Sequence, residues 1–146
     1  MGKRFTRKEN EVFALSPSAT QVDQGLYATP SDKRETFVGM KGNLLITPGG
    51  TAGGTIGVTI YHRREDSNIP TLSVTDGTEI STHLRDVLYS HIQAVDPDID
   101  IPINIPLNIK TARKMKEGDE IFISALASGS GIADVDGVAN IFLKEV

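Results

Sequence analysis

The chain has 146 residues, of which 38% are hydrophobic and 23% are charged, and its formal net charge at pH 7 is −4. This length suits one domain with a sizeable core, and the hydrophobic content is too high for a disordered chain. No apolar run reaches the ~18 residues of a membrane span. The absence of cysteine excludes disulfides, thiolate nucleophiles and cysteine-ligated zinc.

The first residues are basic, whereas the rest of the chain is acidic. Lys3, Arg4, Arg7 and Lys8 give the first eight residues a charge of +4, and residues 9–146 carry −8. A short basic segment commonly contacts polyanions, because each neutralised phosphate releases counterions. We therefore predict that these four side chains bind nucleic acid weakly and without sequence specificity. A merely solvated terminus is the alternative.

The predicted organisation is a basic N-terminal arm, residues 1–10, followed by one β-sandwich domain, residues 11–146. Residues 9–35 are polar and show little periodicity. We expect them to lie along the surface of the sandwich or to contribute one strand near residues 11–15.

Two strands are predicted on either side of a glycine-rich stretch. Apolar residues alternate in 36–47 and again in 55–62, and residues 48–54 contain four glycines and a proline. Strands joined in this way predict a long hairpin. The glycine-rich stretch lacks the Gly-Lys-Ser/Thr ending of a phosphate-binding loop and precedes a strand pattern, so we interpret it as a connection.

The middle of the chain is ambiguous. Residues 71–75 predict a short strand. Apolar residues in 79–95 fall at helical spacing, but 86–95 also alternates as a strand does. We favour a short helix over 79–86 followed by a strand, and the choice between helix and strand stays open.

The strongest local signal lies in residues 99–109, where isoleucine or leucine occupies every odd position. This period of two predicts a strand with one buried and one exposed face. Pro102 and Pro106 lack a backbone donor, which predicts an edge or bulged position.

Two further strands are predicted near the C-terminus, at 120–127 and 138–145, with a charged turn at 114–119 and a loop at 128–137. The total is seven or eight strands with at most one helix. The predicted fold class is therefore all-β, an antiparallel sandwich or barrel.

The sequence offers little catalytic chemistry. His62, His83 and His91 lack metal-binding spacing, and no nucleophile elbow is present. We interpret these histidines as ordinary surface or half-buried residues and predict that the protein is not an enzyme.

Two acidic groups resemble calcium ligands, namely Asp96, Asp98 and Asp100, and Asp134 with Asp136. Neither is followed by the glutamate of a calcium-binding loop. We assign no metal site and no cofactor, although a weak ion site at either group stays open.

A second basic cluster comprises Lys110, Arg113, Lys114 and Lys116. Acidic residues follow it closely, which is typical of a solvated turn. Only 5% of the residues are aromatic, so base-stacking platforms are few and specific base recognition is not expected.

Several of these segments, taken in order, resemble the small coat proteins of circular single-stranded DNA viruses known from environmental sequences. The most specific piece is the Arg-Lys-x-Lys-x-Gly-Asp stretch that enters a strand. The segments that carry the resemblance are residues 34–47, 57–62, 86–89, 99–109 and 113–121.

The resemblance implies a single jelly roll of about eight strands that self-assembles into an icosahedral shell, in a virion and not at a membrane. The basic arm would face the genome, and the loops at 48–54 and 128–137 would lie at subunit contacts or on the exterior. The alternatives are a phage decoration or tail protein and a carbohydrate-binding β-sandwich module.

Overall fold

The computed structural model describes residues 6–48, 54–65, 86–96, 101–128 and 133–145. No helix occurs in this part of the chain, and hence none that is long and apolar enough to cross a bilayer. The strands are β1 (Thr6–Leu15), β2 (Val22–Ala28), β3 (Glu35–Pro48), β4 (Gly54–Arg63), β5 (Val87–Val95), β6 (Ile103–Met115), β7 (Glu120–Ser128) and β8 (Ala133–Glu145).

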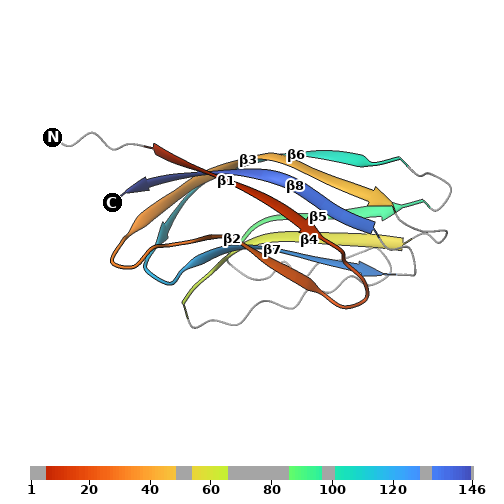
Figure 1. Cartoon of the computed structure of the whole chain (residues 1–146), viewed down its shortest axis with the longest axis horizontal. Helices are drawn as coiled ribbons and strands as arrows, with labels where there is room; N and C mark the ends of the chain where they lie inside the picture. Colours follow the sequence, from red (N-terminus) through yellow and green to blue (C-terminus); the bar gives the residue numbers. More distant parts are fainter. Residues whose placement is uncertain (1–5, 49–53, 66–85, 97–100, 129–132, 146) are drawn as a thin grey trace.

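The strands form two packed antiparallel sheets (Figure 1). One, called here the β1 sheet, has the order β1-β8-β3-β6, and the other, the β2 sheet, has the order β2-β7-β4-β5. The first strand pairs with the last, the second with the seventh, the third with the sixth and the fourth with the fifth. This nested pairing defines a jelly roll, so the predicted all-β sandwich is confirmed.

The core lies between the two sheets and is built by strand alternation. In β6, for example, Leu107, Ile109 and Met115 are buried while Asn108 and Lys110 are exposed. Twenty-two buried hydrophobic residues form one cluster, to which every strand contributes. The largest apolar side chains that are fully buried are Phe13, Phe37, Met40, Leu44, Ile46, Ile56, Ile60, Met115, Ile121, Ile123 and Ile141.

The predicted hairpin over residues 36–62 is wrong. β3 pairs with β8 and β6 in one sheet, whereas β4 pairs with β7 and β5 in the other. Alternation of apolar residues shows which face of a strand is buried, but it does not reveal the neighbouring strand. A glycine-rich connection serves a crossing between two sheets as well as it serves a hairpin.

The edge position predicted from the prolines is confirmed. β6 is the outer strand of the β1 sheet, and Pro106 lies opposite Asn43 of β3 with its ring exposed. The strand continues to Met115, so the charged turn is shorter than predicted and begins at Lys116. A missing backbone donor is tolerated at such an edge, where no further strand needs it.

The early polar region contains more structure than expected. β1 and β2 both lie within residues 6–28, where the sequence predicts at most one strand. Both strands lie at sheet edges, and Leu26 is the one fully buried residue of β2, so a strong apolar alternation is not required of them.

In the middle of the chain, the strand alternative for 86–95 is confirmed as β5. The predicted strand at 71–75 and residues 79–85 of the predicted helix lie outside the described residues.

The three tyrosines of the chain report directly on this packing. Burial raises the pKa of Tyr61 to about 12 and also raises the pKa of Tyr89. Burial, together with a hydrogen bond to the carboxylate of Glu35, raises the pKa of Tyr27. In the native state all three phenols therefore ionise at a higher pH than a free tyrosine does.

At about pH 10, where free tyrosine is half ionised, we expect the ultraviolet absorbance of tyrosinate to be well below half of its full value. Folded-state pKa values above the unfolded value give stability that is complete below about pH 10 and is lost as pH rises through the folded pKa. A spectrophotometric titration, with protein in denaturant as the control, measures this. Ionisation of two or more tyrosines at the denatured-state pKa would contradict the described packing.

Candidate functional site

The structure describes half of the predicted nucleic-acid-binding set. Lys3 and Arg4 lie outside the described residues, whereas Arg7 and Lys8 are part of β1, where they pair with Leu143 and Phe142 of β8. Residues 6–10 of the predicted arm are thus hydrogen-bonded into the β1 sheet. Their role in binding nucleic acid stays a prediction.

Arg7 is held against the sandwich by a buried acid. Its guanidinium forms an ion pair with Glu35, whose side chain has no exposed surface, and also bonds to the hydroxyl of Tyr27 and to Glu9. The Tyr27 hydroxyl in turn donates to Glu35. Lys8, the next residue, is exposed on the opposite face of the strand.

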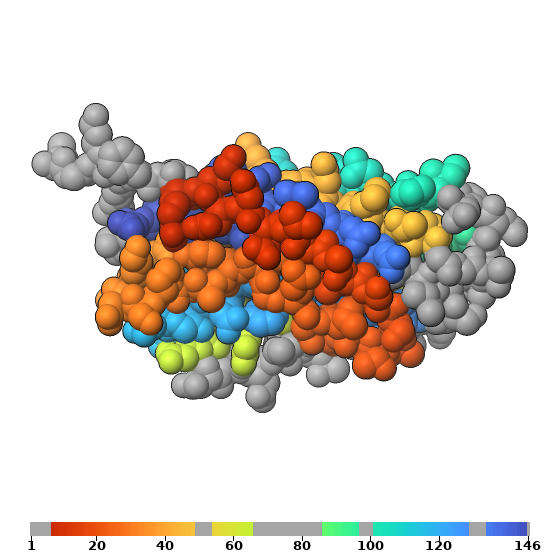
Figure 2. Space-filling model, in the orientation of Figure 1, coloured from red at the N-terminus to blue at the C-terminus, as the bar shows by residue number. Residues whose placement is uncertain are grey.

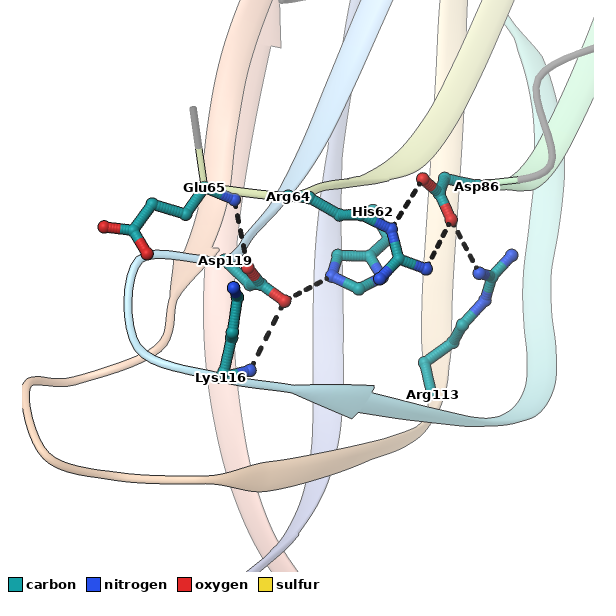
Figure 3. Close-up of polar contacts among 7 residues, drawn as sticks. All are labelled: His62, Arg64, Glu65, Asp86, Arg113, Lys116 and Asp119. Atoms are coloured by element: carbon teal, nitrogen blue, oxygen red, sulfur yellow. Dashed lines mark hydrogen bonds and ion pairs between the residues drawn. The ribbon is translucent and has the colours of Figure 1, made fainter. Parts of the chain in front are cut away.

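A second buried acid, Asp119, joins three segments at one end of the sandwich (Figure 3). One carboxylate oxygen accepts a hydrogen bond from the backbone of Glu65 at 3.0 Å. The other lies 2.9 Å from Nε2 of His62 and 3.3 Å from the backbone nitrogen of Lys116. The Asp119 carbonyl also accepts from the backbone of Thr29. We call these residues the Asp119 network.

Asp86 makes a parallel connection beside this network (Figure 3). Its carboxylate accepts hydrogen bonds from Arg64 at 3.1 Å and from Arg113 at 2.9 Å. Burial alone would raise the pKa of Asp86, but hydrogen bonding and charge, chiefly from Arg64, outweigh it and hold the pKa below its usual value. The carboxylate therefore bridges the ends of β4 and β6.

These contacts give physical roles to the most specific sequence motif, residues 113–119. Arg113 reaches Asp86, Asp119 anchors the network, and Gly118 has a φ of 88°, the left-handed conformation that favours glycine. The motif builds a tight turn that locks β6 to β7.

The distance between His62 and Asp119 resembles that in a catalytic dyad, but the burial does not. Their side chains are 0% and 2% exposed, and the carboxylate already accepts three hydrogen bonds. The buried contact ties the end of β4 to the turn before β7. His91 is half-buried, stacks on Tyr89 and contacts Gln93, and His83 lies outside the described residues.

The acidic groups considered as ion ligands are only partly described. Asp98 and Asp100 lie outside the described residues, and Asp134 accepts a hydrogen bond from Ser16. Within the described part of the chain, no three histidine or acidic side chains gather as a metal site would require.

The outer face of the β1 sheet carries a concentration of positive charge that the sequence order conceals. Lys144 and Lys114 both lie opposite Thr36. Lys110 lies one row further along, opposite Gly39, and Lys41 lies in the row after that, opposite Asn108. The strands that place them are adjacent bands in Figure 2. All are exposed, and with Lys8 they form what we call the basic face, Lys8, Lys41, Lys110, Lys114 and Lys144.

No carboxylate of the described residues lies within ion-pair distance of these five lysines; the ion pairs of the β1 sheet involve Arg7, Lys33 and Arg113 instead. The acids next to Lys8 and Lys144 in the sequence are Glu9 and Glu145. Because side chains alternate along a strand, these two acids belong to the other face of the sheet. Among the described residues, the five lysines of the basic face therefore have no acidic partner.

An aromatic ring lies in the middle of the basic face. Phe142 of β8 pairs with Lys8 on one side and with Gly39 of β3 on the other, and Gly39 in turn pairs with Lys110. A hollow lies beside the ring in this row. A Cβ at Gly39 would collide with the backbone carbonyl of Ile109 on the neighbouring strand. The hollow has a volume of about 190 Å³ and is lined by Val38, Gly39, Met40, Lys41, Ile109, Lys110 and Phe142.

The other half of the same outer face has a different character. Val12 and Val138 are paired and are 70% and 43% exposed, which makes an apolar strip across β1 and β8. Beyond this strip lie Asp134 and Asp136. One sheet face is thus basic at one end and apolar to acidic at the other.

Comparison with known proteins leaves the chain without a family. No protein-family model matches the sequence, and no curated protein sequence matches it. A structure of the Gx strain of infectious bursal disease virus matches 98% of this chain and 36% of its own, with 12% identity and a TM-score of 0.34. T=1 particles derived from a mutant VP2 protein of that virus match 97% of this chain and 41% of their own, with 16% identity and a TM-score of 0.26.

The chain thus spans about two-fifths of the length of these solved chains. Identities and TM-scores this low carry no argument, so the assignment of the fold rests on the strand pairing of this chain itself.

Proposed function

We propose that this protein is a viral coat subunit, many copies of which assemble into an icosahedral shell in the virion. The observation that carries the proposal is the nested strand pairing of a complete eight-stranded jelly roll, an architecture of viral capsid domains that lectins and cupins share. A fold alone does not fix a function. The ordered sequence segments that resemble coat proteins of circular single-stranded DNA viruses favour the coat role.

The two edges of the β1 sheet favour association through faces and loops. At the edge formed by β1, the Gln24 amide accepts a hydrogen bond from the backbone of Ala14 and donates one to the carbonyl of Val12, which occupies edge groups that another strand would use. At the opposite edge, Pro106 offers no donor. Blocked edges prevent open-ended sheet extension, which a closed shell must avoid.

In this proposal the basic arm contacts the genome. Of the four predicted residues, Lys3, Arg4 and Lys8 would neutralise phosphates without reading bases, while the charge of Arg7 is shared with Glu35 and Glu9. The contact would be weak because so few charges take part. The work of the subunit is assembly, with no catalytic step and no cofactor.

Particle formation tests the proposal. We expect the purified protein to form closed shells of uniform size in electron micrographs and in light scattering. A monomer that persists across a wide range of salt and pH would contradict the coat role. A monomer with a reproducible hit on a glycan array would support the carbohydrate-binding alternative, and one that attaches only to preformed phage particles would support a decoration protein.

A further inference from the structure

We propose that the basic face is a docking surface for single-stranded nucleic acid, with lysines on the phosphates and a base stacked on Phe142. This assigns the contact to a folded sheet face and not to the arm alone. The binding itself needs only the folded chain. The further statement that the bound strand is a packaged genome rests on the proposed function.

Charge is the first support for this proposal. The five lysines come from all four strands of the β1 sheet and are exposed, and no carboxylate among the described residues pairs with them. With strands ~4.8 Å apart and alternate residues ~6.7 Å apart, they cover an area of about 14 by 13 Å. Successive phosphates of one nucleic-acid strand are ~3.4 Å apart along a duplex axis, and they are further apart in an extended single strand. Several phosphates therefore fit within this area.

The aromatic ring and its hollow give the second support. Phe142 lies between Lys8 and the position of Gly39, beside the hollow of about 190 Å³ whose rim carries Lys41 and Lys110. Proteins that bind single strands combine cationic grooves with aromatic rings on which bases stack. In a duplex the base faces are covered by their neighbours, so this arrangement favours a single strand.

Amide side chains supply further hydrogen-bonding groups. Asn10, Asn140 and Asn108 share the row of Lys41, each on a different strand of the β1 sheet. An amide both donates and accepts hydrogen bonds, so these groups can meet phosphates or base edges.

A second copy of this chain is the competing occupant, since the other half of the face holds Asp134 and Asp136. Two carboxylates do not balance five lysines, and Asp134 already accepts a hydrogen bond from Ser16. The excess of positive charge favours a polyanion.

Binding of a labelled single-stranded oligothymidylate to the full chain, followed by fluorescence anisotropy over a salt series, tests the proposal. We expect the logarithm of the affinity to fall with the logarithm of salt with a slope of about −3.5, from ~0.7 per neutralised phosphate on a single strand. The double variant Lys41→Gln/Lys110→Gln should bind at least about tenfold more weakly, with a slope reduced by about 1.4.

The matched control is Lys33→Gln/Lys116→Gln, which removes the same charge from exposed lysines outside the basic face. Its affinity should stay within about twofold of the parent, because salt screens distant exposed charges. Phe142→Ala should weaken binding about tenfold without changing the slope, since it removes stacking but no charge. A duplex of the same length should bind more weakly than the single strand. Thermal unfolding of each variant checks that the fold is retained.

Equal weakening by the control pair, or an unchanged slope in Lys41→Gln/Lys110→Gln, would overturn the proposal. So would a salt-sensitive dimer that forms without nucleic acid and is lost in that variant, since the face would then bind a second copy. If Phe142→Ala binds with the same affinity as the parent, no base stacks on Phe142 and that part of the proposal is wrong. If shells form but nucleic-acid binding does not change in the basic-face variants, this inference is refuted and the coat role is not. If binding depends on the basic face but no shells form, the coat role is refuted and this inference is not.

Discussion

Replacement of Asp119 by alanine is expected to lower the free energy of unfolding by about 3–5 kcal/mol, because three hydrogen-bonding groups lose their acceptor at about 1–3 kcal/mol for each buried one. The side chain of Asp119 is 2% exposed and accepts hydrogen bonds from Glu65 and Lys116, besides its contact with His62. Its removal leaves two backbone amides and an imidazole nitrogen without their acceptor. The buried imidazole contributes most to this cost, since the two amides are only partly buried and can be rehydrated.

Urea unfolding followed by circular dichroism measures this effect. Glu117→Ala is the matched control, because Glu117 is an exposed acid in the same turn, and its stability should stay within about 0.5 kcal/mol of the parent. If the two variants lose the same stability, Asp119 does not anchor this end of the sandwich.

Arg7→Ala is expected to have the second largest effect, a loss of about 2–3 kcal/mol. It leaves the buried carboxylate of Glu35 with the hydroxyl of Tyr27 and without its cation. The loss is below that of a fully buried pair because about one third of the Arg7 side chain is exposed to solvent.

Lys8→Ala provides the comparison, since Lys8 is the next residue of the same strand, has the same charge and is exposed. We expect its melting temperature to match the parent within error, while its affinity for single-stranded nucleic acid falls. A larger loss of stability in Lys8→Ala than in Arg7→Ala would contradict the ion pair with Glu35.

The sequence is most informative where one residue pattern determines one structural property. Alternating isoleucines and prolines in residues 99–109 predicted both the strand character and the edge position of β6. The hairpin prediction for β3 and β4 failed because strand pairing depends on residues far away in the chain, and β3 selects β8 and β6 as neighbours.

The basic face was beyond prediction for the same reason. Its lysines are spread from Lys8 to Lys144 and meet only when four strands pair in register. Lys110 and Lys114 were interpreted as part of a solvated turn. One local signal was present, since Thr111, Arg113 and Met115 continue the parity of Ile109 and extend the strand. The buried role of Asp119 left no such signal, because a turn with several charges is typical of exposed chain.

The pairing of the first strand with the last also limits the order in which the chain can fold. Thr6 lies opposite Lys144, and the two ends of the described chain meet at the same end of the sandwich (Figure 1). β1 therefore has no partner in its sheet until β8 has been synthesised, and contacts this distant in sequence form slowly. In a growing chain the strand that carries Arg7 and Lys8 has no sheet partner until residues 133–145 have been added, so its basic residues become fixed only after that point.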